Sequence, residues 1–168
     1  MTSLPLPLRI MVLGIGNTLL QDEGAGVHAM RQLQNEFAAC PDVQFVDGGT
    51  LSFSLAGPIG EAECLLVIDA AELGEKPGTV RVFCDSEMDR FLGANRKRSV
   101  HEVGLLDLLA VSLLTGSLPA QRALVGIQPG VVDWGETPSA AVLAALPAAC
   151  AQARERILAW QKGGDDER

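Results

Sequence analysis

Tyrosine is absent from this chain of 168 residues, and histidine occurs only twice, at His28 and His101. Few side chains could therefore serve as imidazole or phenol catalysts. Cysteine is also sparse and never forms a Cys-x-x-Cys pair; the four residues are Cys40, Cys64, Cys84 and Cys150. We therefore expect reduced thiols that pack in the interior, and neither a zinc site nor a disulfide framework.

Long apolar runs and basic clusters are missing as well. No apolar segment reaches the roughly 18 residues that span a bilayer, and two prolines interrupt the N-terminal stretch where a signal peptide would lie. The formal net charge is -8, and no basic cluster is longer than Arg96-Lys97-Arg98. We expect a cytoplasmic protein that binds neither a membrane nor nucleic acid.

Strand and helix patterns alternate along the chain. Apolar runs and one alternating stretch predict strands at residues 9–15, 43–46, 64–68, 79–83 and 122–128, the fourth of them an edge or antiparallel strand. Apolar residues three or four apart, with stop signals, predict helices at residues 24–39, 52–55, 103–114 and 137–161. Alternation of this kind predicts a three-layer α/β/α fold with a mostly parallel five-stranded sheet.

The boundaries of these elements follow from local signals. Gly57-Pro58 should stop the second helix, and Thr137-Pro138 should open the last one as N-cap and first helical residue. Pro147 should interrupt or kink that helix, and residues 85–99 are polar and irregular in pattern. We expect one domain over residues 1–168, with an extended lead-in at 1–8 and a disordered tail at 162–168.

Acidic residues follow the first three predicted strands: Asp22 and Glu23 after the first, Asp47 after the second and Asp69 after the third. The carboxyl ends of parallel strands meet at one edge of a sheet, and ligands collect there. We therefore expect these acidic positions to converge on one rim.

The turn Gly14-Ile15-Gly16 could instead belong to a dinucleotide fingerprint. The third glycine of that fingerprint is missing, since position 19 is leucine, and an acidic pair beside the helix start would repel a pyrophosphate. No Gly-Lys-Ser/Thr sequence and no Gly-x-Ser-x-Gly elbow is present. A nucleotide-binding or oxidoreductase domain stays as a less favoured alternative.

Glu23, Asp69 and His101 form the remaining set with chemical potential. Two oxygen ligands and one nitrogen ligand suit a divalent metal with open positions, and two carboxylates could act as acid and base on a water. Taken singly, each residue has a simpler role as a cap, turn or helix-start residue. Their convergence on one rim favours a shared site. We expect His28 to be structural or solvated.

Residues 14–27 resemble the opening motif of the hydrogenase maturation endopeptidases, in which Gly-x-Gly-Asn is followed by Asp-Glu-x-x-Gly. The resemblance continues in the family's order through residues 47–50, 67–70, 99–105 and 126–129, and covers roughly residues 10 to 150. It implies a twisted sheet between helices, of phosphorylase/hydrolase-like type, and a monomeric enzyme. The family removes a C-terminal peptide from the large-subunit precursor of nickel-iron hydrogenases after nickel insertion.

The resemblance places the family's metal-binding residues on Glu23, Asp69 and His101. The nickel then arrives with the precursor as recognition signal, and no permanently bound cofactor is expected. Two mechanisms stay open: the metal acts as Lewis acid or template, or Asp69 or Glu23 acts as an aspartic-type general base. Asp47 would support the site residues without binding the metal itself, and Asp22 would be a cap or loop brace. The alternative function is a non-catalytic nickel-binding maturation chaperone.

Overall fold

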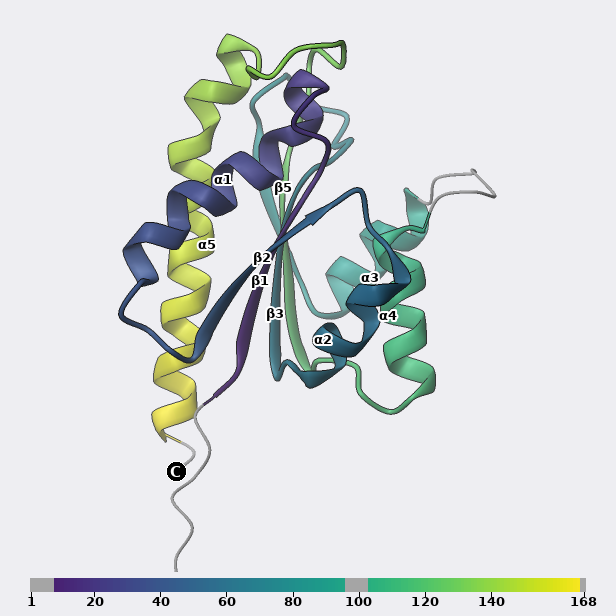
Figure 1. Ribbon diagram of the computed structural model, residues 1–168, viewed down its shortest axis with the longest axis vertical. Helices are drawn as coiled ribbons and strands as arrows, with labels where there is room; N and C mark the ends of the chain where they lie inside the picture. The colour runs from purple at the N-terminus through teal and green to yellow at the C-terminus, as the bar shows by residue number, and fades with distance from the viewer. Residues whose placement is uncertain (1–7, 96–102, 167–168) are drawn as a thin grey trace, which may run out of the picture.

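The computed structural model describes residues 8–95 and 103–166. At its centre is a five-stranded sheet in the order β2-β1-β3-β5-β4 (Figure 1). All neighbouring strands pair in parallel except edge strand β4, which is antiparallel to β5. The strands are β1 Ile10–Ile15, β2 Val43–Gly49, β3 Cys64–Ala70, β4 Val80–Cys84 and β5 Gln121–Ile127. The predicted mostly parallel sheet and its antiparallel edge strand are confirmed.

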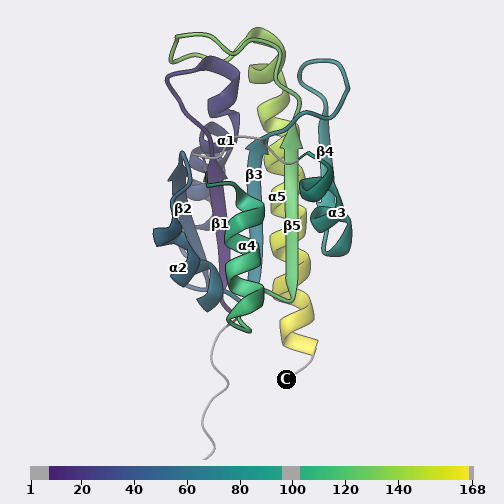
Figure 2. The same cartoon turned by 90° about the vertical axis from the view of Figure 1, so that its right-hand side faces the viewer.

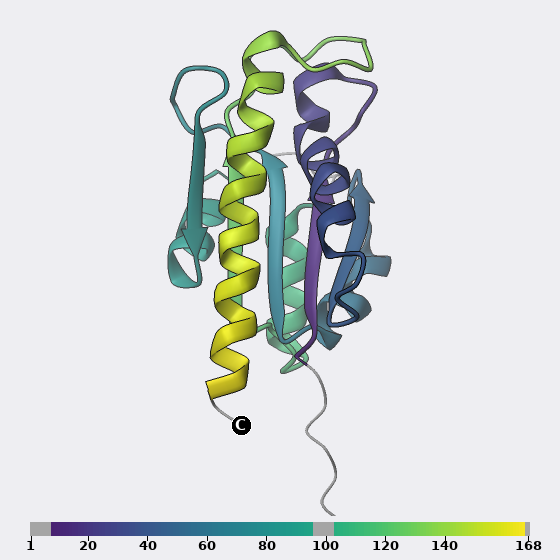
Figure 3. The ribbon, with the colours of Figure 1, turned by 90° about the vertical axis from the view of Figure 1, so that its left-hand side faces the viewer.

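Helices cover both faces of this sheet. Helices α1 (Ala25–Gln34) and α5 (Ala140–Asp166) lie on one face (Figure 3), and α2 (Ala56–Glu61), α3 (Ser86–Ala94) and α4 (Leu105–Leu114) lie on the other (Figure 2). Successive side chains of β3 enter two different buried clusters: Leu66 packs on the side of α1 and α5, and Val67 packs on the opposite side. Burial on both faces explains the continuous apolar run of β3 and confirms the three layers.

The helix predicted at residues 24–39 is divided into three pieces. A 3-10 turn, η1 (Gln21–Gly24), precedes α1, and a second one, η2 (Asn35–Phe37), follows it. The apolar stripe that predicted the helix is buried, since Val27, Met30 and Leu33 are at most 3% exposed. The stripe was therefore assigned correctly, and only the regularity of the two ends differs.

The Gly57-Pro58 pair does not stop the second helix, contrary to the prediction. A 3-10 turn, η3 (Phe53–Leu55), leads directly into α2, in which Pro58 is the third residue. The first four N–H groups of a helix have no partner within it, so a proline in the first turn removes no hydrogen bond. The helix consequently continues to Glu61.

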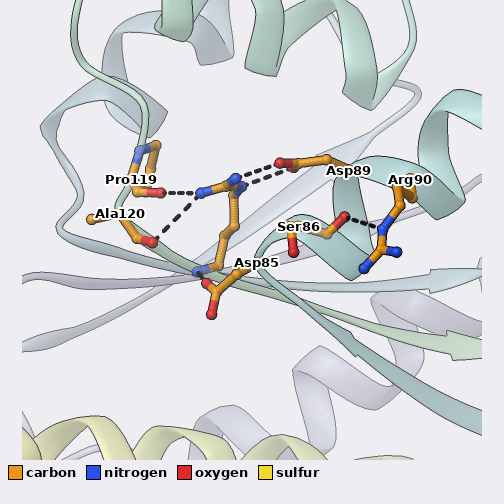
Figure 4. Close-up of polar contacts among 7 residues, drawn as sticks. Asp85, Ser86, Asp89, Arg90, Pro119 and Ala120 are labelled. Atoms are coloured by element: carbon orange, nitrogen blue, oxygen red, sulfur yellow. Dashed lines mark hydrogen bonds and ion pairs between the residues drawn. The ribbon is translucent and has the colours of Figure 1, made fainter.

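Helix α3 occupies a stretch that the sequence predicted to be irregular. Arg122, at the start of β5, donates from Nε to Asp89 Oδ1 of α3 at 2.9 Å, and a second guanidinium nitrogen contacts the other carboxylate oxygen (Figure 4). The backbone N–H of Arg122 donates to Asp85 Oδ1, directly before α3, at 3.0 Å. The partners are more than 30 residues apart in sequence, so the local pattern of polar residues could not indicate this anchor.

Helix α5 begins at Ala140 and not at Thr137. Ser139 precedes it: its carbonyl accepts from the N–H of Leu143 at 2.9 Å. The helix runs through Pro147 to Asp166, into the tail for which disorder was predicted. Contacts of its buried face with the sheet and α1 offset the hydrogen bond that proline removes. Neither α5 nor any other helix in the described ranges is long and apolar enough to cross a membrane.

The carboxyl edge of the sheet gathers the segments that follow β1, β3 and β5 (Figures 1 and 3). Helix α4 runs against the strand direction, because the segment after its end packs at the opposite edge, where Ser117 contacts Gly60 just before β3. The first turn of α4 therefore lies toward the carboxyl edge (Figure 2). The elements flanking all three predicted site residues thus lead to one end of the molecule.

Candidate functional site

Glu23 lies on η1, and two glycines press its segment onto the ends of β1 and β3. A Cβ added to Gly16 would lie 1.8 Å from the carbonyl oxygen of Glu23, and one added to Gly26 would lie 2.1 Å from the carbonyl oxygen of Ile68. Only glycine allows such close approach. The residue after Ile68 is Asp69, so Glu23 and Asp69 stand on directly adjoining segments.

The Gly-x-Gly turn therefore serves close packing of the backbone, and its geometry is not that of a phosphate cradle. The φ of Gly16 is +132°, a conformation that side-chain-bearing residues rarely adopt, and Gly14 faces the Cβ of Met30, 2.8 Å from where its own Cβ would stand. The same turn that suggested a dinucleotide site is explained by the placement of Glu23. The Gly-x-Gly turn, which was the main feature in favour of a nucleotide-binding domain, thus has another explanation.

A Gly16→Ala variant should be less stable by at least about 2 kcal/mol and should process substrate poorly, because its methyl group must displace the Glu23 carbonyl. Thermal unfolding and cleavage assays measure the two effects. Gly57→Ala is the matched control, since nothing lies within 4 Å of a Cβ at that helical position. An unchanged melting temperature for Gly16→Ala would contradict the close approach.

Asp69 lies near the end of β3, on the face of the sheet that α4 covers. Side chains alternate along a strand, and Val67, two residues earlier, belongs to the buried cluster on that face. Asp69 and Glu23 are both half-buried, so each carboxylate keeps part of its contact with solvent. Two carboxylates of this kind suit a cation or an attacking water.

His101, the third predicted site residue, belongs to the segment 96–102, which lies outside the described residues. The described chain resumes at Val103, just before the first turn of α4. Within residues 8–95 and 103–166, no three His, Cys, Asp or Glu side chains lie close enough together to hold a metal ion. The three-residue site of Glu23, Asp69 and His101 stays a prediction.

Asp47 is engaged elsewhere. Its Oδ2 accepts from the guanidinium of Arg31 on α1 at 3.0 Å, and its Oδ1 accepts from the N–H of Gly49 at 2.9 Å. Helix α1 covers the face opposite to the one that Asp69 faces. Asp47 thus lies at the same carboxyl edge as Asp69, since Gly14 pairs with both Asp47 and Ile68, but its side chain is on the other face of the sheet, where it shapes the end of β2.

Asp22 is fully buried and braces the loop after β5. Its carboxylate accepts from the N–H groups of Gly130 and Val131, both at 2.8 Å, and from the N–H and hydroxyl of Ser139, at 2.6 and 2.8 Å. Burial raises the pKa of Asp22, but these hydrogen bonds outweigh it, and the net pKa lies below the ordinary value of 3.8. These four hydrogen bonds tie Asp22 to the loop after β5, which fits the loop brace that the sequence suggested.

His28 has a structural setting on α1. Its Nε2 is buried and has no hydrogen-bond partner within the described ranges. Burial, and then the positive charge of Arg31, lowers the pKa of His28 below 6.5. The imidazole is therefore neutral near pH 7, in agreement with the structural role expected for it.

Gln128 organises a second loop at this edge, and sequence reasoning did not single it out. The side chain is 4% exposed; its Oε1 accepts from the N–H of Leu73 at 2.7 Å, and its Nε2 donates to Glu72 at 3.2 Å. The loop after β3 is thereby tied to the end of β5. The available signal was a glutamine between an apolar strand and Pro129, where a buried amide can satisfy loop backbone groups.

Comparisons with known proteins identify the family of this chain. A family model described as hydrogenase maturation protease matches residues 27–156. Hydrogenase expression/formation protein HupM of Azotobacter chroococcum mcd 1 is 40% identical over 164 residues, covering 94% of this chain and 78% of that protein. Hydrogenase 2 maturation protease of Escherichia coli K12 is 34% identical over 135 residues, covering 79% of this chain and 81% of that protein.

Solved structures of the same kind share the fold. The hydrogenase maturating endopeptidase HybD from Escherichia coli superposes with a TM-score of 0.79 at 30% identity, covering 94% of both chains. The [NiFe] hydrogenase maturation protease HybD from Thermococcus kodakarensis gives 0.72 at 31% identity, covering 88% of this chain and 98% of that one. The resemblance and the fold expected from the motifs are confirmed. This chain belongs to the hydrogenase maturation protease family and is an endopeptidase of hydrogenase maturation.

Proposed function

We propose that this enzyme removes the C-terminal peptide from the nickel-loaded large-subunit precursor of a nickel-iron hydrogenase. Membership of the family supports the reaction, and the adjoining segments of Glu23 and Asp69 support the place where it occurs. Both carboxylates come from one chain, so a monomer suffices. We place the reaction in the cytoplasm, where a newly made precursor is met.

Nickel enters this proposal as part of the substrate. Glu23, Asp69 and His101 offer two oxygen donors and one nitrogen donor, a set that suits a borderline divalent ion. Approaching the open coordination positions of a nickel ion held by the precursor, they would dock the scissile bond next to the two carboxylates. An unloaded precursor lacks this attachment point, so the metal acts as the signal that insertion is complete.

The carboxylates then have a task in the hydrolysis itself. Water must lose a proton as it attacks the scissile carbonyl, and the leaving amine must gain one. Asp69 or Glu23 takes that proton if the reaction is of the aspartic type. If the substrate's metal polarises the water or the carbonyl, the same residues hold the metal in position for it.

Incubating the purified enzyme with precursor that carries or lacks nickel tests this function. We expect the nickel-loaded precursor alone to lose the mass of its C-terminal peptide, measured by intact-mass spectrometry. An unchanged mass together with tight nickel binding by this chain would identify the maturation chaperone instead. Equal cleavage of both precursors would remove nickel from the recognition step.

A further inference from the structure

Exposed apolar side chains gather beside the Glu23 segment. Leu19 is 50% exposed, Val131 44%, Val132 57% and Trp134 79%; we call these four residues the apolar patch. The N–H of Gly135 donates to the carbonyl of Leu19 at 2.9 Å, in a parallel bridge between Leu20 and Gly135. That pairing sets Leu19 next to Trp134. The two segments lie together at the carboxyl end of the molecule (Figures 1 and 3).

Hydrogen bonds to the buried Asp22 hold the apolar patch in place. The buried Asp22 carboxylate accepts from the N–H groups of Gly130 and Val131, and the N–H of Asp22 donates to the carbonyl of Val131 at 3.1 Å. A carboxylate is costly to bury, and here every bond it makes fixes this loop. The fold therefore presents the apolar side chains to water in a defined arrangement.

Such a surface is a recognition feature. Contiguous exposed apolar residues mark interaction sites, and tryptophan is among the side chains most enriched where a few residues dominate binding energy. The chain has two tryptophans, and the other, Trp160, is 7% exposed in the core. Trp134 is thus the tryptophan placed for contact with another molecule.

Distance along the chain ties the patch to the site. Leu19 precedes Glu23 by four residues, which span at most about 14 Å when fully extended. The actual path is tighter, since the N–H of Glu23 donates to the carbonyl of Leu20 at 3.2 Å. A protein substrate with its scissile bond at Glu23 therefore reaches the patch within about four residues of that bond.

We propose that the apolar patch binds apolar side chains of the precursor close to its cleaved bond, as a docking surface that is independent of nickel. This inference rests on the proposed function. Nickel contacts would then supply the signal that insertion is complete, and the apolar patch would supply affinity for the protein chain. The two contributions separate in kinetics, because binding energy that is equal in ground state and transition state changes KM alone.

A Trp134→Ala, Val132→Ala double variant tests the proposal in cleavage of the nickel-loaded precursor. We expect KM to rise about tenfold or more, with kcat and the melting temperature unchanged. Replacing Trp134 by phenylalanine instead of alanine should restore most of the affinity for the precursor that the double variant loses. Leu114→Ala is the matched control: this leucine is 86% exposed at the end of α4, at the opposite edge of the sheet, and its loss should leave KM unchanged.

The outcomes separate the two proposals. Failure of the wild-type enzyme to cleave overturns the proposed function. Normal cleavage by the wild type with an unchanged KM in the double variant overturns the docking surface alone. Sedimentation of the wild type as a dimer that the double variant loses, again with unchanged KM, would assign the patch to a second copy of this chain.

Discussion

Glu23→Gln and Asp69→Asn variants should fold normally and process the precursor at least about a hundredfold more slowly. Each substitution keeps the size of the side chain and removes the charge that either proposed mechanism requires, as metal donor or as general base. His101→Ala should have a similar effect if it completes the set. Both carboxylates are half-buried on one end of the sheet, so neither loss creates a cavity in the core. Intact-mass assays of the nickel-loaded precursor over time measure the rates.

Asp47→Asn provides the matched control for these variants. It makes the same chemical change near the same edge of the sheet, but Asp47 pairs with Arg31 on the other face. Processing should continue at the wild-type rate, as it should for His28→Ala. Wild-type rates for both Glu23→Gln and Asp69→Asn would show that the site has been placed on the wrong residues.

The sheet could be predicted because its strands carry their own signal. β3 is apolar from Cys64 to Ile68 since both faces are buried there, and β4 alternates because it lies at an edge. These are local consequences of burial, visible in one segment at a time. The carboxyl-edge position of Glu23 and Asp69 followed from strand direction alone, without knowledge of any contact.

Contacts between distant segments could not be predicted in this way. Helix α3 depends on Arg122, and the start of α5 depends on Ser139, whose N–H and hydroxyl reach Asp22 from 117 positions away in sequence. Local signals at Thr137-Pro138 looked equally good for a helix start. In the structure the helix begins at Ala140, directly after the residue that bonds to Asp22.

The neighbouring acids Asp22 and Glu23 illustrate the same limit within the site. Both follow the first strand, and composition does not distinguish them. The structure separates them by burial: Asp22 is fully buried under the loop after β5, and Glu23 stays half-exposed at the rim. Asp22 accepts four hydrogen bonds within the described chain, while Glu23 keeps part of its exposure to solvent.

An Asp22→Asn variant should lose about 3 kcal/mol or more of unfolding free energy at neutral pH, because an amide presents hydrogens to backbone N–H groups that the carboxylate accepts from. Denaturant titration measures the loss. The apolar patch should loosen with it, so KM should rise even where the variant is folded. Asp133→Asn is the control: Asp133 is an exposed acid of the same loop that bonds only the N–H of Trp134 within the described chain.

The effect of Asp22 should also depend on pH in a defined direction. Its pKa in the folded state lies below the ordinary value of 3.8, so the folded protein binds the proton less readily than the unfolded chain. The stabilisation is complete above the unfolded value and is lost as pH falls through the folded one. The stability difference between wild type and Asp22→Asn should therefore be constant from pH 7 to about pH 5 and shrink below about pH 4. A difference that instead grew on acidification would mean that Asp22 is protonated in the folded protein, and that the loop carrying Trp134 is held by a neutral acid.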